Sequence, residues 1–136
     1  PRIESIVRRR LAQDYADERS LFGGRADAVT FDDVVRAAYL GSRLARQTLE
    51  DAGRYLGVAV ANAVNLLNPE LVIVGGKLGM STPIVADAVQ AAVHSRVFSA
   101  KGKRTPVVAS TLADAVVLGA AALVIDEAFS FFTALP

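Results

Sequence analysis

The sequence predicts an α/β fold that is mostly helical and contains one short parallel βαβ unit. Apolar residues recur at helical spacing along most of the 136 residues. Two short runs rich in β-branched residues, at 70–74 and 106–110, flank one of the helical segments. Strand, helix and strand in that order favour a right-handed crossover between parallel strands. Because two parallel strands do not make a self-sufficient sheet, we expect the chain to be part of a larger α/β structure.

The first half of the chain is predicted to contain two helical segments. An apolar residue at every fourth position predicts a helix over residues 3–15. The polar stretch 16–29 is predicted to be a loop. Thr30, with Asp33 three positions later, has the pattern of a helix N-cap. The second helix therefore begins at Thr30.

This second helical segment runs to Leu67 and can break at Gly41-Ser42. Gly53 and Gly57 lie one turn apart, where small residues let another element approach closely. Because glycine lowers helix propensity, packing at these positions must compensate. Asn68-Pro69 ends the helix, since the residue before a proline avoids the helical conformation.

The second half supplies the βαβ unit and a final helix. The apolar run Glu70–Val74 predicts a strand buried on both faces. Thr82 and Pro83 are a helix start, with proline at the first helical position. Residues 99–104 are predicted to be an exposed loop, and Ser110 or Thr111 is predicted to cap a last helix. The predicted core consists of Leu56, Val60, Val64, Val72, Val74, Val108, Leu118 and Leu123.

Composition and charge exclude several classes of function. A net charge of +1 is too small for nucleic-acid binding driven by electrostatics alone. With no cysteine and one histidine, His94, disulfide frameworks, thiolate zinc sites and histidine metal clusters are excluded. No apolar run approaches the ~20 residues of a membrane-spanning helix. These features fit a cytoplasmic origin, and His94 is predicted on a helix surface.

The apolar content exceeds what a chain of this size readily buries. Hydrophobic residues make up 52% of the sequence, and its mean hydropathy is +0.35. Small domains keep much of their surface exposed, so the surplus predicts an interface. We expect a homodimer that uses the helix Thr30–Leu67 or the last helix, Leu112–Phe132, with the tail "FSFFTALP" as a contact.

The double glycine Gly75-Gly76 follows the first strand directly. Ligands in open α/β sheets bind beyond the carboxyl ends of the strands, and glycine there removes the Cβ that would collide with a nucleotide. The other interpretation is a tight turn without a ligand. Spacing alone favours the turn.

Two longer segments resemble a known family. "LGVAVANAVNLLNPELVIVGGKLG" and "LADAVVLGAAALV" are similar to the C-terminal part of the ROK family (repressor, open reading frame, kinase), over most of residues 43–128. The family comprises sugar kinases and sugar-responsive transcriptional regulators. The resemblance implies the actin-like, ribonuclease H-like ATPase fold. In the family's kinases the Gly-Gly turn resembles the adenosine motif, so Gly75, Gly76 and Lys77 become candidate cofactor-binding residues.

The sequence departs from the kinase pattern at Lys77, where the adenosine motif usually has a small residue. The resemblance implies that this side chain crowds the nucleotide, as is more typical of regulators; alternatively, its ammonium reaches a phosphate. The family's catalytic Asp, its Glu-x-Gly-His sugar motif, its zinc loop, its phosphate loop and the regulators' helix-turn-helix are absent. In family order all of them precede Pro1.

The resemblance leaves two functions open, and in both the chain, residues 1–136, is a single partial domain from the C-terminal part of a longer protein. In the first it belongs to a sugar-responsive transcriptional regulator, as scaffold, cleft wall and oligomerisation surface, without enzymatic activity. In the second it contributes the adenosine-binding turn of a glucokinase-like sugar kinase. A structural module without a ligand is a third interpretation. We expect no catalytic residue, metal or cofactor in this chain, and ATP only in a parent kinase. The intact protein is expected to bind a sugar ligand, and to contact DNA only through the absent helix-turn-helix.

Other polar residues receive structural interpretations. Asn68 is predicted to cap the helix end, and Asn62 and Asn65 to make structural contacts. Asp114 fits a capping role better than a nucleotide or metal contact. Asp32 and Asp33 are assigned to helix initiation, because adjacent helical residues point about 100° apart and cannot act as a carboxylate pair.

Overall fold

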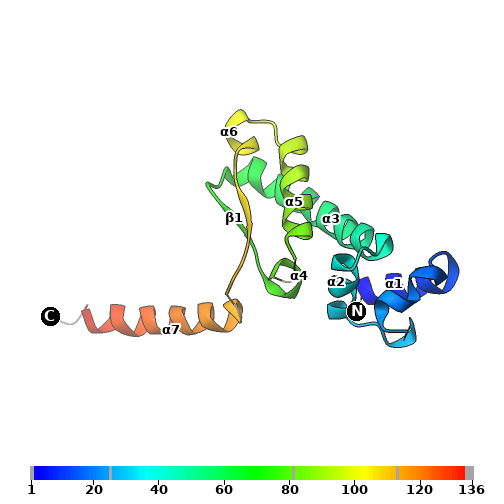
Figure 1. The fold of residues 1–136 in the computed structure, drawn as a ribbon. Helices are drawn as coiled ribbons and strands as arrows, with labels where there is room; N and C mark the ends of the chain where they lie inside the picture. Colours follow the sequence, from blue (N-terminus) through cyan, green and yellow to red (C-terminus); the bar gives the residue numbers. More distant parts are fainter. Residues whose placement is uncertain (1, 25, 81, 113, 134–136) are drawn as a thin grey trace.

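The chain forms a helical body on one side of a two-stranded ribbon, and the last helix projects away from it (Figure 1). The computed structural model describes residues 2–24, 26–80, 82–112 and 114–133. Its elements are α1 (Arg2–Gln13), η1 (Ala16–Phe22), η2 (Ala26–Ala28), α2 (Phe31–Tyr39), α3 (Arg43–Leu67), β1 (Val72–Val74), α4 (Gly76–Met80), α5 (Pro83–Arg96), α6 (Ala100–Lys103), β2 (Val107–Ala109) and α7 (Ala115–Thr133).

The predicted start and break of the second helical segment are confirmed. The Thr30 N–H donates to Asp33 Oδ2 (3.0 Å) and the Asp33 N–H donates to Thr30 Oγ1 (3.3 Å), which makes a capping box. The segment is divided into α2 and α3 at Gly41, whose φ of +95° favours glycine. Ser42 then caps α3, because its hydroxyl accepts the N–H of Ala45.

The predicted loop over residues 16–29 is largely wrong, because two 3₁₀ turns, η1 and η2, occupy most of it. The reason is a contact that is distant in sequence. Glu18 is buried, and its carboxylate accepts hydrogen bonds from the Ser42 hydroxyl and the Leu44 N–H. At the N-terminus of α3 the Glu18 carboxylate accepts a hydrogen bond from a free backbone N–H and interacts favourably with the helix dipole. Because Glu18 belongs to η1, these interactions fix η1 in place.

Helices α3 and α5 pack against each other at the two predicted glycines. A Cβ on Gly53 would lie 2.7 Å from the Ala88 Cβ, and one on Gly57 would collide with Ala92. These separations leave no room for a side chain, so the two helices touch through their backbones. The predicted role of both glycines is confirmed.

The core lies between α1, α2, α3 and α5, and the sheet contributes one face to it. β1 pairs with β2 in parallel, with Val72 opposite Val107 and Val74 opposite Ala109. Val74 is buried and Val72 packs against the core, whereas Ile73 between them is 61% exposed. The prediction that this strand is buried on both faces is therefore wrong for the described residues. No described element covers the face that carries Ile73 and Val108.

The predicted core is correct in the middle of the chain and wrong at its end. Val64 and Val74 are buried, and Leu56, Val60 and Val72 pack against the core. In contrast, Val108, Leu118 and Leu123 are exposed. The core instead takes apolar residues from the helices before residue 50 and from the inner face of α5. They include Val7, Leu11, Phe22, Val34, Leu44, Leu49, Val85, Val89 and Val93.

Two further boundaries differ from the prediction. α7 begins at Ala115, so neither Ser110 nor Thr111 is its N-cap; Ser110 Oγ accepts the N–H of Leu112 in a local turn instead. The predicted loop at 99–104 contains the short helix α6, which Ser99 caps by accepting the N–H of Gly102. In contrast, Thr82 caps α5 with Pro83 at its start, as predicted.

Candidate functional site

The carboxyl ends of β1 and β2 lie side by side, and each is followed by small residues. Gly75 and Gly76 follow β1, and Ser110 follows β2. The Ser110 N–H donates to the Val74 carbonyl oxygen (2.9 Å), and a Cβ on Gly75 would lie 3.9 Å from the Ser110 Cβ. The parallel register thus brings residues 75 and 110 together at the edge where α/β folds bind ligands.

Gly76 is required by the backbone conformation of this turn. Its φ is +71°, in the left-handed region, and it begins the short helix α4. A Cβ on Gly76 would meet nothing within 4 Å. Space outside the turn is therefore open to a ligand. The positive φ of the turn also explains the glycine if no ligand binds there.

The Lys77 side chain connects this turn to the start of α2. Its Nζ lies 3.1 Å from Asp32 Oδ2 and 5.8 Å from the centre of the Phe31 ring. Both the lysine and the aspartate remain largely exposed, so the ion pair is weak. The Lys77 ammonium, next to the Gly75-Gly76 turn, nevertheless has the Asp32 carboxylate and the Phe31 ring beside it.

Asp32 and Asp33 therefore have different roles. Asp33 closes the capping box and pairs with Arg36 (2.7 Å). Asp32 points to Lys77, which is 45 positions away in the sequence. The sequence interpretation that gave both residues to helix initiation is correct for Asp33 and incomplete for Asp32.

The remaining polar candidates are structural. Asn68, in the left-handed conformation with φ +46°, ends α3 as predicted, and Asn65 holds the segment after α5 through two hydrogen bonds. His94 is on the exposed surface of α5. Asp114, with φ +53°, directly precedes α7, and its carbonyl accepts the N–H of Leu118.

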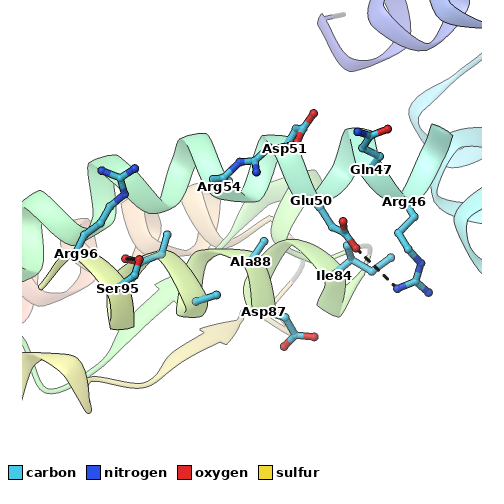
Figure 2. A pocket seen from close by; sticks show the side chains of 12 residues that line it. Arg46, Gln47, Glu50, Asp51, Arg54, Ile84, Asp87, Ala88, Ser95 and Arg96 are labelled. Carbon is cyan, nitrogen blue, oxygen red and sulfur yellow. Dashed lines mark hydrogen bonds and ion pairs between the residues drawn. The ribbon is translucent and has the colours of Figure 1, made fainter. Parts of the chain in front are cut away.

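A separate groove of about 600 Å³ runs along the outer surface between α3 and α5 (Figure 2). Its floor contains Ala88 and Ala92, and its walls carry both signs of charge. Arg54 pairs with Asp51, and Arg46 lies 4.0 Å from Glu50. Because these charges partly neutralise one another, the groove has no dominant polarity that would select a ligand.

The part of the chain that the structure describes contains neither a metal site nor a membrane-spanning helix. No three His, Cys, Asp or Glu side chains in these ranges are grouped so that they can hold a metal ion. None of the described helices is long and apolar enough to cross a membrane.

The sequence matches the ROK family over residues 5–127. The chain is 32% identical over 126 residues to the xylose repressor of Caldicellulosiruptor bescii, covering 92% of this chain and 32% of the repressor. It is 31% identical over 122 residues to the DNA-binding transcriptional dual regulator NagC of Escherichia coli, covering 90% of this chain and 29% of NagC. The chain belongs to the ROK family, and it spans about a third of the length of these relatives.

The fold is similar to that of a solved crystal structure. A crystal structure of a putative sugar kinase from Cytophaga hutchinsonii superimposes with a TM-score of 0.76 and 21% identity, over 90% of this chain and 40% of the kinase. At this identity the similarity concerns the fold alone. It confirms the actin-like ATPase fold that the sequence resemblance implies.

Proposed function

We propose that the chain is the C-terminal part of a sugar-responsive transcriptional regulator of the ROK family. In this role it is a scaffold, one wall of the ligand cleft and an oligomerisation surface, and it has no enzymatic activity of its own. The observation that supports it most is that two relatives matched over at least 90% of this chain are, by name, a repressor and a transcriptional regulator. In the intact protein the sugar lies in the cleft of which this chain forms one wall, and DNA is contacted by parts of the protein outside these residues.

The environment of Lys77 supports the regulator over the kinase. In a kinase, Gly75 and Gly76 would lie against the nucleoside of ATP. Here the Lys77 chain extends from the same turn to Asp32 and Phe31. A nucleotide at the turn would approach this ion pair, and the Asp32 carboxylate would repel its phosphates. Loss of nucleotide binding is acceptable in a regulator but not in a kinase.

The second candidate is a sugar kinase, because a putative sugar kinase shares the fold and the space outside Gly76 is open. In that case Lys77 would leave Asp32 and approach a phosphate as a point charge. Calorimetry of the chain with ATP distinguishes the two. We expect no detectable binding, whereas micromolar affinity that is abolished by Gly76→Val would favour the kinase.

The oligomerisation surface is proposed at α7. Among the side chains of α7 that the structure describes, the large apolar residues Val117, Leu118, Leu123, Val124 and Ile125 are exposed. At 100° per residue they spread over about 220° of the helix circumference. A helix that is apolar over most of its surface needs cover on several sides. The described body of the chain does not provide that cover, so another copy or another part of the protein must.

The regulator proposal is tested directly on the protein at its natural length. DNA affinity is measured by mobility shift with and without a panel of monosaccharides, and ADP release is measured with the same sugars and ATP. A sugar-dependent change in DNA affinity without ADP release is the expected result. Sugar-dependent ADP release well above background would replace the regulator with the kinase.

A further inference from the structure

The end of the molecule opposite the Gly75-Gly76 turn exposes three large apolar side chains. In Figure 1, α6 lies where α3 and α5 both end, at the amino ends of the two strands. Phe98, in the segment between α5 and α6, is 90% exposed. Leu66 and Leu67, in the last turn of α3, are 83% and 71% exposed. Single exposed apolar residues are ordinary, but three large ones at one end of the fold indicate an interaction surface.

The backbone around Phe98 is held firmly, so the exposure of its ring is imposed by the fold. The Phe98 N–H donates to Asn65 Oδ1 (3.1 Å), and Asn65 Nδ2 donates to the Arg96 carbonyl oxygen (3.4 Å). Val97, next to Phe98, is buried. The Val97 side chain points inward, and the Phe98 N–H is bonded to Asn65 of α3, so the Phe98 ring must point outward.

The following helix is fixed to the same end of α3. A Cβ on Gly102 would lie 2.7 Å from Val97 Cγ1 and 3.3 Å from Val64 Cγ1, so α6 packs closely on both residues. The buried Thr105 hydroxyl donates to the Pro69 carbonyl oxygen (3.0 Å). The segment from Arg96 to Thr105 is thus a preformed platform, and a partner would lose little conformational entropy in ordering it.

This platform carries four exposed cationic side chains, those of Arg96, Lys101, Lys103 and Arg104. None of them forms an ion pair with a described residue, whereas Arg36, Arg46, Arg54 and Lys77 elsewhere in the fold each lie beside a carboxylate. The acidic residues nearest to them in the sequence are Asp87, nine positions before Arg96, and Asp114, ten positions after Arg104. A local excess of positive charge therefore stands out in a chain whose net charge is only +1.

We propose that these seven residues, Leu66, Leu67, Arg96, Phe98, Lys101, Lys103 and Arg104, form a docking patch for an acidic protein segment that also carries apolar side chains. Phe98 is the anchor, because a rigid exposed aromatic ring gives large contact area at low entropic cost. The four cations attract and orient an acidic partner and disfavour a basic one. The patch is remote from the Gly75-Gly76 turn, so the proposal does not depend on whether that turn binds a nucleotide.

Two other polyanionic partners fit the patch less well. A nucleic-acid backbone would use the cations but presents no apolar partner to Leu66 and Leu67, and it favours longer basic surfaces. An anionic membrane would require a protruding apolar element or an amphipathic helix. Here the apolar side chains are carried by the last turn of α3 and by one fixed residue of a connecting segment.

Fluorescence anisotropy with a labelled synthetic peptide tests the proposal on the chain itself. The probe is an amphipathic peptide of Glu residues with Leu and Phe at helical spacing. Two control peptides replace every Glu by Gln, or every Leu and Phe by Ser. We expect the probe to bind and both controls to bind more weakly. Raising the salt concentration should weaken the probe, because exposed charges are screened beyond ~8 Å at 0.15 M ionic strength.

Substitutions then locate the binding. Phe98→Ser, and the pair Lys101→Glu with Lys103→Glu, should each weaken the probe on the order of tenfold, which is ~1.4 kcal/mol. The matched controls are Tyr55→Ser and Arg9→Glu, which change an exposed aromatic residue and an exposed cation outside the patch. Circular dichroism verifies that each variant is folded.

The proposal is overturned if the patch variants bind the probe as well as the controls do. It is also overturned if the chain binds random-sequence duplex DNA, or vesicles containing phosphatidylserine, more tightly than the probe, and if the patch variants lose that binding. Such binding to DNA would identify a nucleic-acid surface, and such binding to vesicles a membrane surface.

Discussion

Helices α5 and α7 are both rich in apolar residues, yet among their described side chains only those of α5 include buried ones. α5 buries Val85, Val89 and Val93 against α3, where Gly53 and Gly57 let the backbones approach. α7 also carries a glycine, Gly119, but a Cβ there would meet nothing within 4 Å. Apolar periodicity therefore predicts that a helix exists and needs cover. It does not tell which part of the protein provides that cover.

The largest contrast is expected between a buried leucine of α3 and an exposed leucine of α7. Leu49→Ala should destabilise the chain by ~2–5 kcal/mol, because it leaves a cavity in the core. In the monomer, replacing Leu123, which is 72% exposed, by Ala should cost less than ~0.5 kcal/mol. Urea denaturation at concentrations too low for self-association measures both substitutions. A large loss for Leu123→Ala under these conditions would mean that the body of the chain covers α7 in solution.

Self-association is the next test, because α7 is our proposed interface. We expect the chain, with a monomer mass of 14.3 kDa, to form a homodimer in sedimentation equilibrium. Leu123→Asp should weaken the dimer by ~2–3 kcal/mol, since a leucine loses its burial and a charge replaces it. Ala122→Asp is the control, because Ala122 lies on the narrow helix face shared with Gly119 and Asp126. A chain that stays monomeric at tens of micromolar would contradict the proposed interface.

A pair of glycine substitutions sharpens the same comparison. Gly57→Ala puts a methyl group into Ala92 and the backbone of Val89, and overpacking of this kind costs ~1–3 kcal/mol. Gly119→Ala adds a methyl group to open space and should stabilise α7 by up to ~1 kcal/mol through helix propensity. Thermal unfolding should therefore shift in opposite directions. Equal shifts would mean that the close contact of α3 and α5 is not maintained in solution.

The parts of the fold that the sequence predicted depend on neighbouring residues. The capping box of Thr30 and Asp33, the start of α5 at Thr82-Pro83 and the end of α3 at Asn68 are each determined within a few positions. The missed parts depend on distant contacts. Residues 16–22 were predicted to be a loop because nothing nearby shows that Glu18 reaches the N-terminus of α3. The exposed face of Ile73 was missed because a continuous apolar run does not show which face of a strand the other elements cover.

The candidate site follows the same division. The position of Gly75-Gly76 at a strand end was predictable, because a β-branched run followed by two glycines is a local pattern. The contact of Lys77 with Asp32 was not predictable, since 45 residues separate the two and no charge pattern connects them. Whether this turn binds a nucleotide stays a prediction, and the family resemblance that made it one came from residues 43–128 as a whole.

The smallest expected effect concerns that contact. Lys77 and Asp32 are both mostly exposed, so their ion pair should contribute only ~0.2–1 kcal/mol to the free energy of unfolding. A double-mutant cycle with Lys77→Ala and Asp32→Ala isolates this coupling by urea denaturation, and high salt should reduce it. The matched control is the pair Asp51 and Arg54, which lies within α3 and connects no distant segments. Coupling near zero for Lys77 and Asp32 would mean that the carboxylate does not hold the ammonium, and it would remove the main structural argument for the regulator over the kinase.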